Sequence, residues 1–196
     1  MNKRWITAGA VLVLLTIVSL GAWYWGKDEP TALRVGDKAP NFVLADLEGN
    51  EVELHSLRGS VVVLTFWSTW CSTCPRDLLS LNLLYQGAAH EPFEILAVGV
   101  DQEGLPVVRR FAERKELVYT VLADPQEKTA AAYRRLTLPQ TFLIDQTGVI
   151  RHIATGSRDW TTEANMNHIR NLLHSAGAPS TGRPDSGGTL ENGALD

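Results

Sequence analysis

The pattern of hydrophobic and polar positions divides the chain into three unlike segments. Residues 5–25 carry no charged side chain, residues 37–175 alternate between short apolar runs and amphipathic stretches, and residues 176–196 are rich in Gly, Pro, Ser and Thr. The middle segment is the one that can bury a core, so we expect a single folded domain there, with residues 28–36 as a linker. The last segment holds few large apolar side chains and is expected to be a disordered tail.

Within the middle segment the apolar runs predict an α/β domain, with a mixed central sheet covered by helices on both faces. Residues 61–67 and 93–100 are almost wholly apolar, which is typical of central strands buried on both sides. Leucines recur at helical spacing after Cys74. The other predicted elements are a hairpin over 42–44 and 52–54, a helix over 105–116, a strand over 118–122, a helix over 127–135, an antiparallel pair over 141–144 and 149–154, and a helix over 161–174 capped by Thr161 or Thr162.

The N-terminal apolar run has the length of a membrane-spanning helix. At about 1.5 Å per residue it covers roughly 30 Å, the thickness of the hydrocarbon core of a bilayer. Lys3 and Arg4 precede it and aromatic residues 23–25 close it, so we predict an uncleaved anchor over residues 1–27 with its N-terminus in the cytoplasm. The alternative is a signal peptide cleaved after the small residues of Ser-Leu-Gly at 19–21. Both interpretations predict export of the folded domain.

Composition and charge narrow the class of protein further. The 196 residues include 18 Lys or Arg and 22 Asp or Glu, a net charge of −4. This balance lacks the positive charge that neutralises phosphates, so we expect no nucleic-acid partner. Only two cysteines occur, Cys71 and Cys74, which excludes a scaffold of several disulfides.

The two cysteines form a Cys-x-x-Cys pair between a predicted buried strand and a predicted amphipathic helix. We expect both thiols in the first turn of that helix, close enough to form a disulfide. Free N–H groups at a helix N-terminus favour a thiolate on Cys71, and the helix dipole accounts for about one pKa unit of that effect. Cys71 is therefore predicted to be the nucleophile and Cys74 the resolving thiol that attacks a mixed disulfide.

Three other uses of the cysteine pair compete with redox chemistry: a zinc site, a structural disulfide and a copper-binding pair. The pair could supply two of the four ligands of a zinc ion, but the sequence has no second Cys pair to complete the site. A purely structural disulfide that closes so short a loop would stabilise the fold little. A copper-binding pair would need a nearby histidine, and none lies close in sequence. The histidines are scattered and are interpreted as surface or capping residues: His55, His90, His152, His168 and His174. We therefore expect no metal and no cofactor.

Four sequence segments resemble a known family. Residues 66–74, Phe-Trp-Ser-Thr-Trp-Cys-Ser-Thr-Cys, resemble the active-site segment of thioredoxin-fold proteins. Residues 138–145, Leu-Pro-Gln-Thr-Phe-Leu-Ile-Asp, resemble the cis-proline loop of the TlpA/ResA-like branch, and residues 36–42 and 57–59 extend the match. The resemblance implies a thioredoxin fold with an N-terminal β-hairpin and a central insertion over residues 101–125.

The same resemblance implies roles for residues around the cysteines. Pro139 would be cis and face the cysteine pair, while the backbone of Leu138 would pair with a bound peptide. Trp70 would form an apolar platform for substrates, or else pack in the core. Asp77 stands where related proteins carry a Glu and would exchange a proton with Cys74, or else it is an exposed acid that favours the first helical turn. Thr65 replaces the buried acid of cytoplasmic thioredoxin.

Members of this branch are anchored or exported thiol–disulfide oxidoreductases, commonly reductants in cytochrome c maturation or related assembly. The resemblance thus implies protein disulfide or dithiol substrates and a thiol protein of the membrane as electron donor. It also implies a single-pass protein of the inner membrane with its catalytic domain on the periplasmic side. Two alternatives stay open: a peroxiredoxin-like peroxidase, whose pattern is half met because Leu64 replaces its Pro while Ser68 fits, and a copper metallochaperone or assembly factor.

Overall fold

The computed structural model describes residues 16, 19, 32–87, 92–134 and 137–175. The predicted anchor over residues 1–27, apart from residues 16 and 19, and the predicted tail beyond residue 175 lie outside these ranges. Within the ranges that are described, no helix combines the length and the apolar character needed to span a bilayer.

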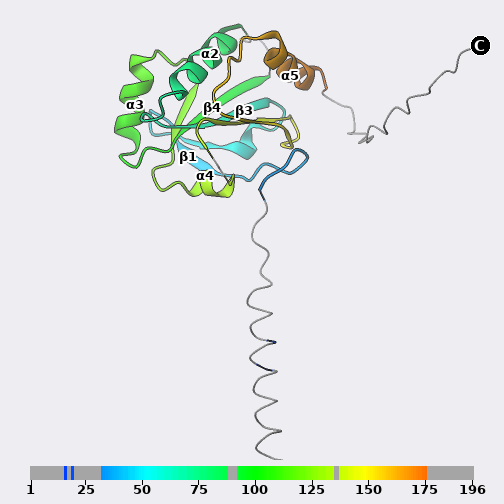
Figure 1. Cartoon of the computed structure of the whole chain (residues 1–196), viewed down its shortest axis with the longest axis horizontal. Coiled ribbons are helices and arrows are strands. Elements are labelled where there is room, and N and C mark those ends of the chain that lie inside the picture. Colours follow the sequence, from blue (N-terminus) through cyan, green and yellow to red (C-terminus); the bar gives the residue numbers. More distant parts are fainter. Residues whose placement is uncertain (1–15, 17–18, 20–31, 88–91, 135–136, 176–196) are drawn as a thin grey trace, which may run out of the picture.

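Five strands form one mixed sheet with the order β5-β4-β3-β6-β7 (Figure 1). They are β3 (Val61–Trp67), β4 (Phe93–Gly99), β5 (Thr120–Ala123), β6 (Gln140–Ile144) and β7 (Ile150–Thr155). β3, β4 and β5 run parallel, and β6 and β7 are antiparallel to their neighbours. The mixed sheet expected from the sequence is confirmed, and β3 lies at its centre.

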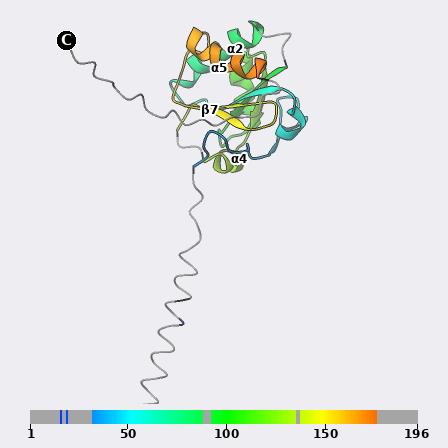
Figure 2. The ribbon, with the colours of Figure 1, turned by 90° about the vertical axis from the view of Figure 1, so that its right-hand side faces the viewer.

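Helices cover both faces of this sheet, as predicted. The helices are η1 (Leu54–Leu57), α2 (Cys74–Gly87), α3 (Leu105–Arg114), α4 (Lys128–Ala132) and α5 (Glu163–His174). Apolar side chains of α2, α3 and α5 belong to one core, and those of α4 to a second core on the opposite face. Figures 1 and 2 show α2 and α5 side by side on one side of the sheet and α4 on the other.

The position of β3 at the centre of the sheet explains why its residues are apolar throughout instead of alternating with polar ones. Val63 and Trp67 point into the core beneath α2, whereas Leu64 and Phe66 point into the core beneath α4. Successive side chains of a strand face opposite sides, so a strand covered on both sides needs apolar residues throughout. Each of these four side chains is fully buried, which is worth about 1.5–3 kcal/mol apiece.

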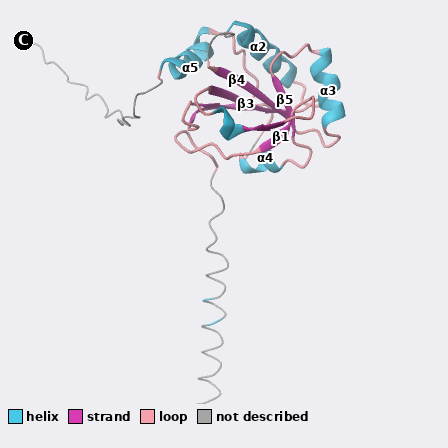
Figure 3. Ribbon diagram, turned by 180° about the vertical axis from the view of Figure 1, so that it is seen from behind, coloured by secondary structure: helices cyan, strands magenta, loops and turns pink. Residues whose placement is uncertain are grey.

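The predicted N-terminal hairpin is present as a separate two-stranded sheet of β1 (Val43–Ala45) and β2 (Glu51–Glu53). Its turn contains Gly49 at a φ of 91°, a left-handed conformation that glycine adopts without strain. Asp46 forms an isolated antiparallel bridge with Leu122 of β5. The hairpin is thereby attached to the strand at the sheet edge. The region predicted as a central insertion forms α3 and β5 (Figure 3).

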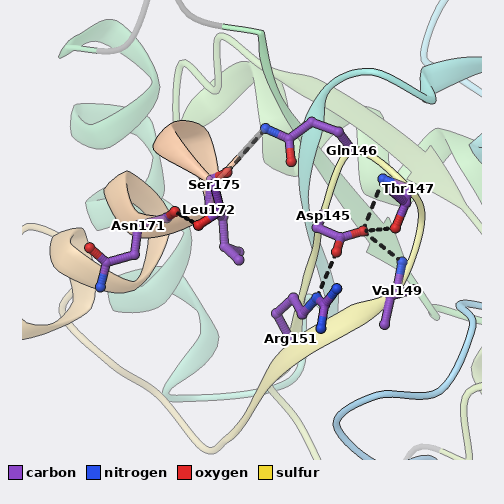
Figure 4. Close-up of polar contacts among 8 residues, drawn as sticks. All are labelled: Asp145, Gln146, Thr147, Val149, Arg151, Asn171, Leu172 and Ser175. Atoms are coloured by element: carbon purple, nitrogen blue, oxygen red, sulfur yellow. Dashed lines mark hydrogen bonds and ion pairs between the residues drawn. The ribbon is translucent and has the colours of Figure 1, made fainter. Parts of the chain in front are cut away.

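The turn between β6 and β7 is held by one carboxylate. Asp145 Oδ1 accepts the N–H of Val149 at 2.9 Å, and Oδ2 accepts the Nε–H of Arg151 at 2.6 Å (Figure 4). The neighbouring Gln146 donates its side-chain amide to the carbonyl of Leu172 at 3.0 Å. The antiparallel pair is therefore linked to α5, which packs over the same face as α2.

The ends of two helices differ from the sequence predictions. The helix predicted over 127–135 spans only Lys128–Ala132, and that predicted over 105–116 ends at Arg114. Arg134 and Glu116 adopt positive φ angles of 50° and 51°, which a right-handed helix cannot continue through. Thr162 occupies the N-cap position of α5, as predicted, but its side chain makes no capping hydrogen bond.

Candidate active site

The two cysteines form a disulfide where β3 passes into α2. The sulfur atoms are 2.11 Å apart and the Cα atoms 5.4 Å apart. Cys74 is fully buried, whereas 8% of Cys71 is exposed. Cys71 is therefore the more exposed residue of the pair, although both cysteines are buried.

The helix begins at Cys74, three residues later than the predicted start at Cys71. Cys74 is the first residue of α2, so Cys71 lies in the turn before the helix and not inside its first turn. Pro75 follows at once, where its missing N–H costs little because the first N–H groups of a helix are unpaired. The N–H of Cys74 points back to Cys71 Sγ at 3.2 Å. The end of the helix thus still favours negative charge on Cys71, as the sequence predicted.

A buried carboxylate holds the loop in front of the cysteines. Asp101, two residues after the end of β4, is only 1% exposed. It accepts the backbone N–H of Thr69 at 3.0 and 3.1 Å and the Thr69 hydroxyl at 2.5 Å. In the sequence, Asp101 stands out only as the start of the predicted insertion. The signal that could have identified it is its position, because the carboxyl ends of adjacent parallel strands meet at one edge of a sheet.

Asp77 lies one helical turn after Cys74 and is 1% exposed. Its Oδ1 atom accepts the backbone N–H of Arg158 at 2.9 Å and the indole N–H of Trp160 at 3.0 Å. Oδ2 is buried and has no hydrogen-bond partner among the described residues. Burial raises the pKa of Asp77 to about 6, although both hydrogen bonds act in the opposite direction. The alternative of an exposed acid is therefore wrong.

The expected cis peptide bond is present between Leu138 and Pro139. It immediately precedes β6, and Gln140, the first residue of β6, pairs with Phe66 near the end of β3. Since β3 leads directly to the turn of Cys71, the cis-proline loop lies along the strand end that carries the cysteines. Leu138 is partly buried and packs against both cores.

The two tryptophans near the cysteines lie in opposite environments. Trp70, directly before Cys71, is 70% exposed, whereas Trp67 at the end of β3 is fully buried. The alternative that Trp70 packs in the core is therefore wrong. An exposed indole beside the more exposed cysteine is available to contact another molecule.

Two further predictions concern groups away from the disulfide. Thr65 is buried and accepts the hydroxyl of Thr141 at 2.9 Å, so a neutral pair occupies this part of the core. His152 and His168, interpreted as scattered, stack with ring centroids 4.3 Å apart, because β7 and α5 bring them together. Burial, with the adjacent His168, lowers the pKa of His152. The described residues contain no group of three or more His, Cys, Asp or Glu arranged to hold a metal ion.

Comparison with known proteins agrees with this geometry. Residues 35–153 match the model of the AhpC/TSA family. Thiol-disulfide oxidoreductase ResA of Geobacillus thermodenitrificans is 40% identical over 164 residues, which cover 83% of this chain and 92% of that protein. ResA of Halalkalibacterium halodurans is 34% identical, over 79% of this chain and 88% of that protein.

A solved structure is similar to this chain in both fold and sequence. A protein from Chlorobium tepidum, described as thiol:disulfide interchange protein DsbE, superposes with a TM-score of 0.68 at 32% identity. The match covers 72% of this chain and 99% of that chain. Together with the Cys71–Cys74 pair on a thioredoxin fold, these likenesses confirm the family and the class of reaction. The chain belongs to the AhpC/TSA family and is a ResA-like thiol–disulfide oxidoreductase.

Proposed function

We propose that the protein reduces disulfides of other exported proteins while tethered to the membrane by its N-terminal segment. The observation that carries the direction of attack is the unequal exposure of the two cysteines. Cys71 is the more exposed residue and its Sγ accepts the N–H of Cys74, while Cys74 is fully buried. Attack through Cys71 and resolution through Cys74 follow from this asymmetry.

The reaction proceeds in two exchange steps. In the first, the thiolate of Cys71 attacks one sulfur of the substrate disulfide, whose S–S bond breaks as a mixed disulfide forms. The released substrate sulfur takes up a proton. In the second, Cys74 loses its proton and attacks the sulfur of Cys71, which releases the other substrate thiol. Two electrons and two protons pass to the substrate, and Cys71 and Cys74 end as a disulfide.

Asp77 is the acid–base group of the second step in this proposal. It lies three residues after Cys74 on the same face of α2 and is enclosed with it. With a pKa raised to about 6 by burial, its carboxyl can exchange a proton near neutral pH. A typical carboxylate with a pKa near 4 would be a weaker proton acceptor for a thiol.

The substrate would contact the surface around Cys71. In this proposal the exposed indole of Trp70 makes an apolar contact with the substrate, and the backbone of Leu138, before Pro139, pairs with an extended peptide. Trp70 precedes Cys71, and the Leu138–Pro139 bond precedes the strand paired with β3. The two features therefore flank the same strand end.

The cellular setting is proposed from the sequence. An uncharged run over residues 5–25 preceded by Lys3 and Arg4 supports a single-pass anchor in the inner membrane, with the catalytic domain on the periplasmic side. A thiol protein of the membrane would return the dithiol to its reduced state by donating two electrons. Tethering would keep the domain close to that donor. Cytochrome c maturation, or a related assembly process, is the proposed use of the reducing power.

The reduction potential of the Cys71–Cys74 pair tests the direction of electron flow. A reductant is expected to have a potential near or below about −270 mV, whereas a value near about −120 mV would contradict the proposal. Cys74→Ala should accumulate a mixed disulfide through Cys71, and Cys71→Ala should form none. Trapping through Cys74 in the Cys71→Ala variant would contradict the assigned roles.

The setting has its own test, independent of the chemistry. The full chain and a variant lacking residues 5–25 are expressed in a host with a periplasm and fractionated. The full chain should stay with membranes at alkaline pH and be cleaved by protease added to the periplasmic side, and the variant should do neither. Loss of holocytochrome c in a deletion strain, restored by the full chain and not by Cys71→Ala, would support the assembly role. Unchanged holocytochrome c would contradict it.

Assays on the same purified protein distinguish the two alternatives, a peroxidase and a copper metallochaperone. Peroxide consumption faster than thiol exchange would favour a peroxidase. Stoichiometric copper binding that Cys71→Ala abolishes, without disulfide reduction, would favour a metallochaperone. Leu64 at the position of the peroxidase proline, and the disulfide formed by both cysteines, support the oxidoreductase instead.

A further inference from the structure

A segment distant in sequence encloses the start of α2. The backbone N–H of Trp160 donates to the hydroxyl of Ser80 at 3.1 Å, and that hydroxyl donates to the carbonyl of Asp77 at 2.8 Å. The backbone N–H of Arg158 and the indole N–H of Trp160 both reach Asp77 Oδ1, at 2.9 and 3.0 Å. Residues 158–160 are thus bound to α2 by hydrogen bonds to the carboxyl group of Asp77 and to the hydroxyl of Ser80.

The two oxygens of that carboxyl group have different surroundings. Oδ1 receives two N–H donors, and Oδ2 is buried without a partner among the described residues. A proton on Oδ1 would face two hydrogen atoms that already point at that oxygen. The neutral form of Asp77 therefore carries its proton on Oδ2, and the ionised form is stabilised through Oδ1.

We infer that Trp160 is a positioning residue for thiol–disulfide exchange, holding Oδ1 of Asp77 so that the carboxyl exchanges its proton through Oδ2. The inference rests on the proposed role of Asp77 as proton partner of Cys74. Indole N–H is a donor only, so Trp160 can stabilise the carboxylate but cannot itself take or supply the proton. Trp160 is fully buried, which keeps its donor fixed on Oδ1.

The charged and titratable groups around Asp77 come from three parts of the fold. The guanidinium of Arg158 favours its ionised form, and Cys74 lies one turn earlier on α2. Tyr119, just before β5, donates its hydroxyl to the carbonyl of Leu78 at 3.0 Å. Burial and the adjacent Asp77 raise the pKa of Tyr119, so it remains neutral while Asp77 titrates. The indole of Trp160 is the one neutral side-chain donor among these described contacts of Asp77.

A tryptophan elsewhere in the core offers a matched control. Trp67 is as fully buried as Trp160, but its indole N–H has no hydrogen-bond partner among the described residues. Its ring packs against Phe111, with centroids 4.9 Å apart. Replacing either tryptophan by phenylalanine removes one ring and one N–H, and only at position 160 does the lost N–H serve Asp77.

The test uses the full reduced chain with a small aromatic disulfide as substrate. The measured quantity is the rate at which the second substrate thiol is released, as a function of pH, because this step needs Cys74. Trp160→Phe should move the inflection of this profile upward by about one pH unit, because a hydrogen bond to a charged group is lost. Trp67→Phe should leave the inflection in place. In an Asp77→Asn background the inflection should be absent, and adding Trp160→Phe should change nothing further.

A second measurement covers the case in which Trp160→Phe does not fold. In the unaltered full chain labelled with ¹³C and ¹⁵N, the indole resonance of Trp160 should titrate together with the carboxyl carbon of Asp77, and that of Trp67 should not. Asp77→Asn should abolish the titration at Trp160. A resonance that is independent of Asp77 would overturn the inference.

The possible failures are distinguishable. If the wild-type chain reduces no disulfide, the proposed function itself fails. If Asp77→Asn keeps the wild-type inflection, the role of Asp77 fails and the inference fails with it. If Asp77→Asn loses the inflection while Trp160→Phe leaves it unmoved, only the role of Trp160 is overturned.

Discussion

Replacing Asp77 by Asn removes a buried ionisable group while keeping its shape and its hydrogen-bond acceptor. The amide oxygen can still receive the N–H groups of Arg158 and Trp160, which now bind Oδ1. The amide nitrogen takes the place of Oδ2, which has no partner to lose among the described residues. The main change is therefore that residue 77 can no longer become charged.

The expected effect on stability depends on pH. Burial raises the pKa of Asp77 from 3.8 to about 6, so the folded state holds this proton more tightly than the unfolded state does. The stabilisation is fully present below pH 3.8 and is lost as the pH rises through about 6. At about 1.36 kcal/mol per pKa unit, wild-type stability should fall relative to Asp77→Asn by about 2–3 kcal/mol between about pH 4 and pH 8.

The assay is unfolding of the oxidised proteins in guanidinium chloride at several pH values, with the difference in free energy of unfolding plotted against pH. Taking the difference cancels the titration of all other groups. Glu163→Gln is the matched control, because it removes an exposed acid from the first turn of α5 and should stay within about 0.5 kcal/mol of wild type. A wild-type to Asp77→Asn difference that is constant from pH 4 to pH 8 would refute the reasoning.

Two other substitutions separate binding from folding. Trp70→Ala should change the free energy of unfolding by no more than about 0.5 kcal/mol, since Trp70 is 70% exposed, yet slow the reduction of a protein disulfide more than that of a small disulfide. Equal slowing of both substrates would exclude a platform for the protein chain. Asp101→Asn should cost about 1–3 kcal/mol and slow both substrates, because Thr69 loses a charged acceptor. Unchanged stability in a denaturant titration would show that this contact does not hold the loop.

Sequence reasoning worked well where the controlling interactions are local. β3 was predicted over residues 61–67 because a strand with two buried faces must be apolar throughout, and the cysteine pair was predicted from its place between this strand and a helix. The exact start of α2 was missed, since the turn from Cys71 to Cys74 depends on backbone angles that residue types leave open.

The environment of Asp77 shows what local patterns leave undetermined. From the sequence, an acid in the first turn of a helix is as compatible with solvent as with the core. Its burial results from residues 158–160, which lie some eighty positions away and contact it only after β6 and β7 return the chain across the sheet. The exposure of Trp70 and the pairing of His152 with His168 were likewise decided by packing.

The sequence alone therefore determined the class of fold, the reactive pair Cys71 and Cys74, and the proline that precedes β6. Hydrophobic periodicity indicated the α/β class and the Cys-x-x-Cys spacing the reactive pair, whereas the proline was identified through the resemblance to the TlpA/ResA-like branch. Only the tertiary structure decided which cysteine is more exposed, that Asp77 is enclosed, and that Trp160 and Asp101 serve the site. Burial and long-range hydrogen bonds set the pKa and the position of a side chain, and both depend on segments that are distant along the chain.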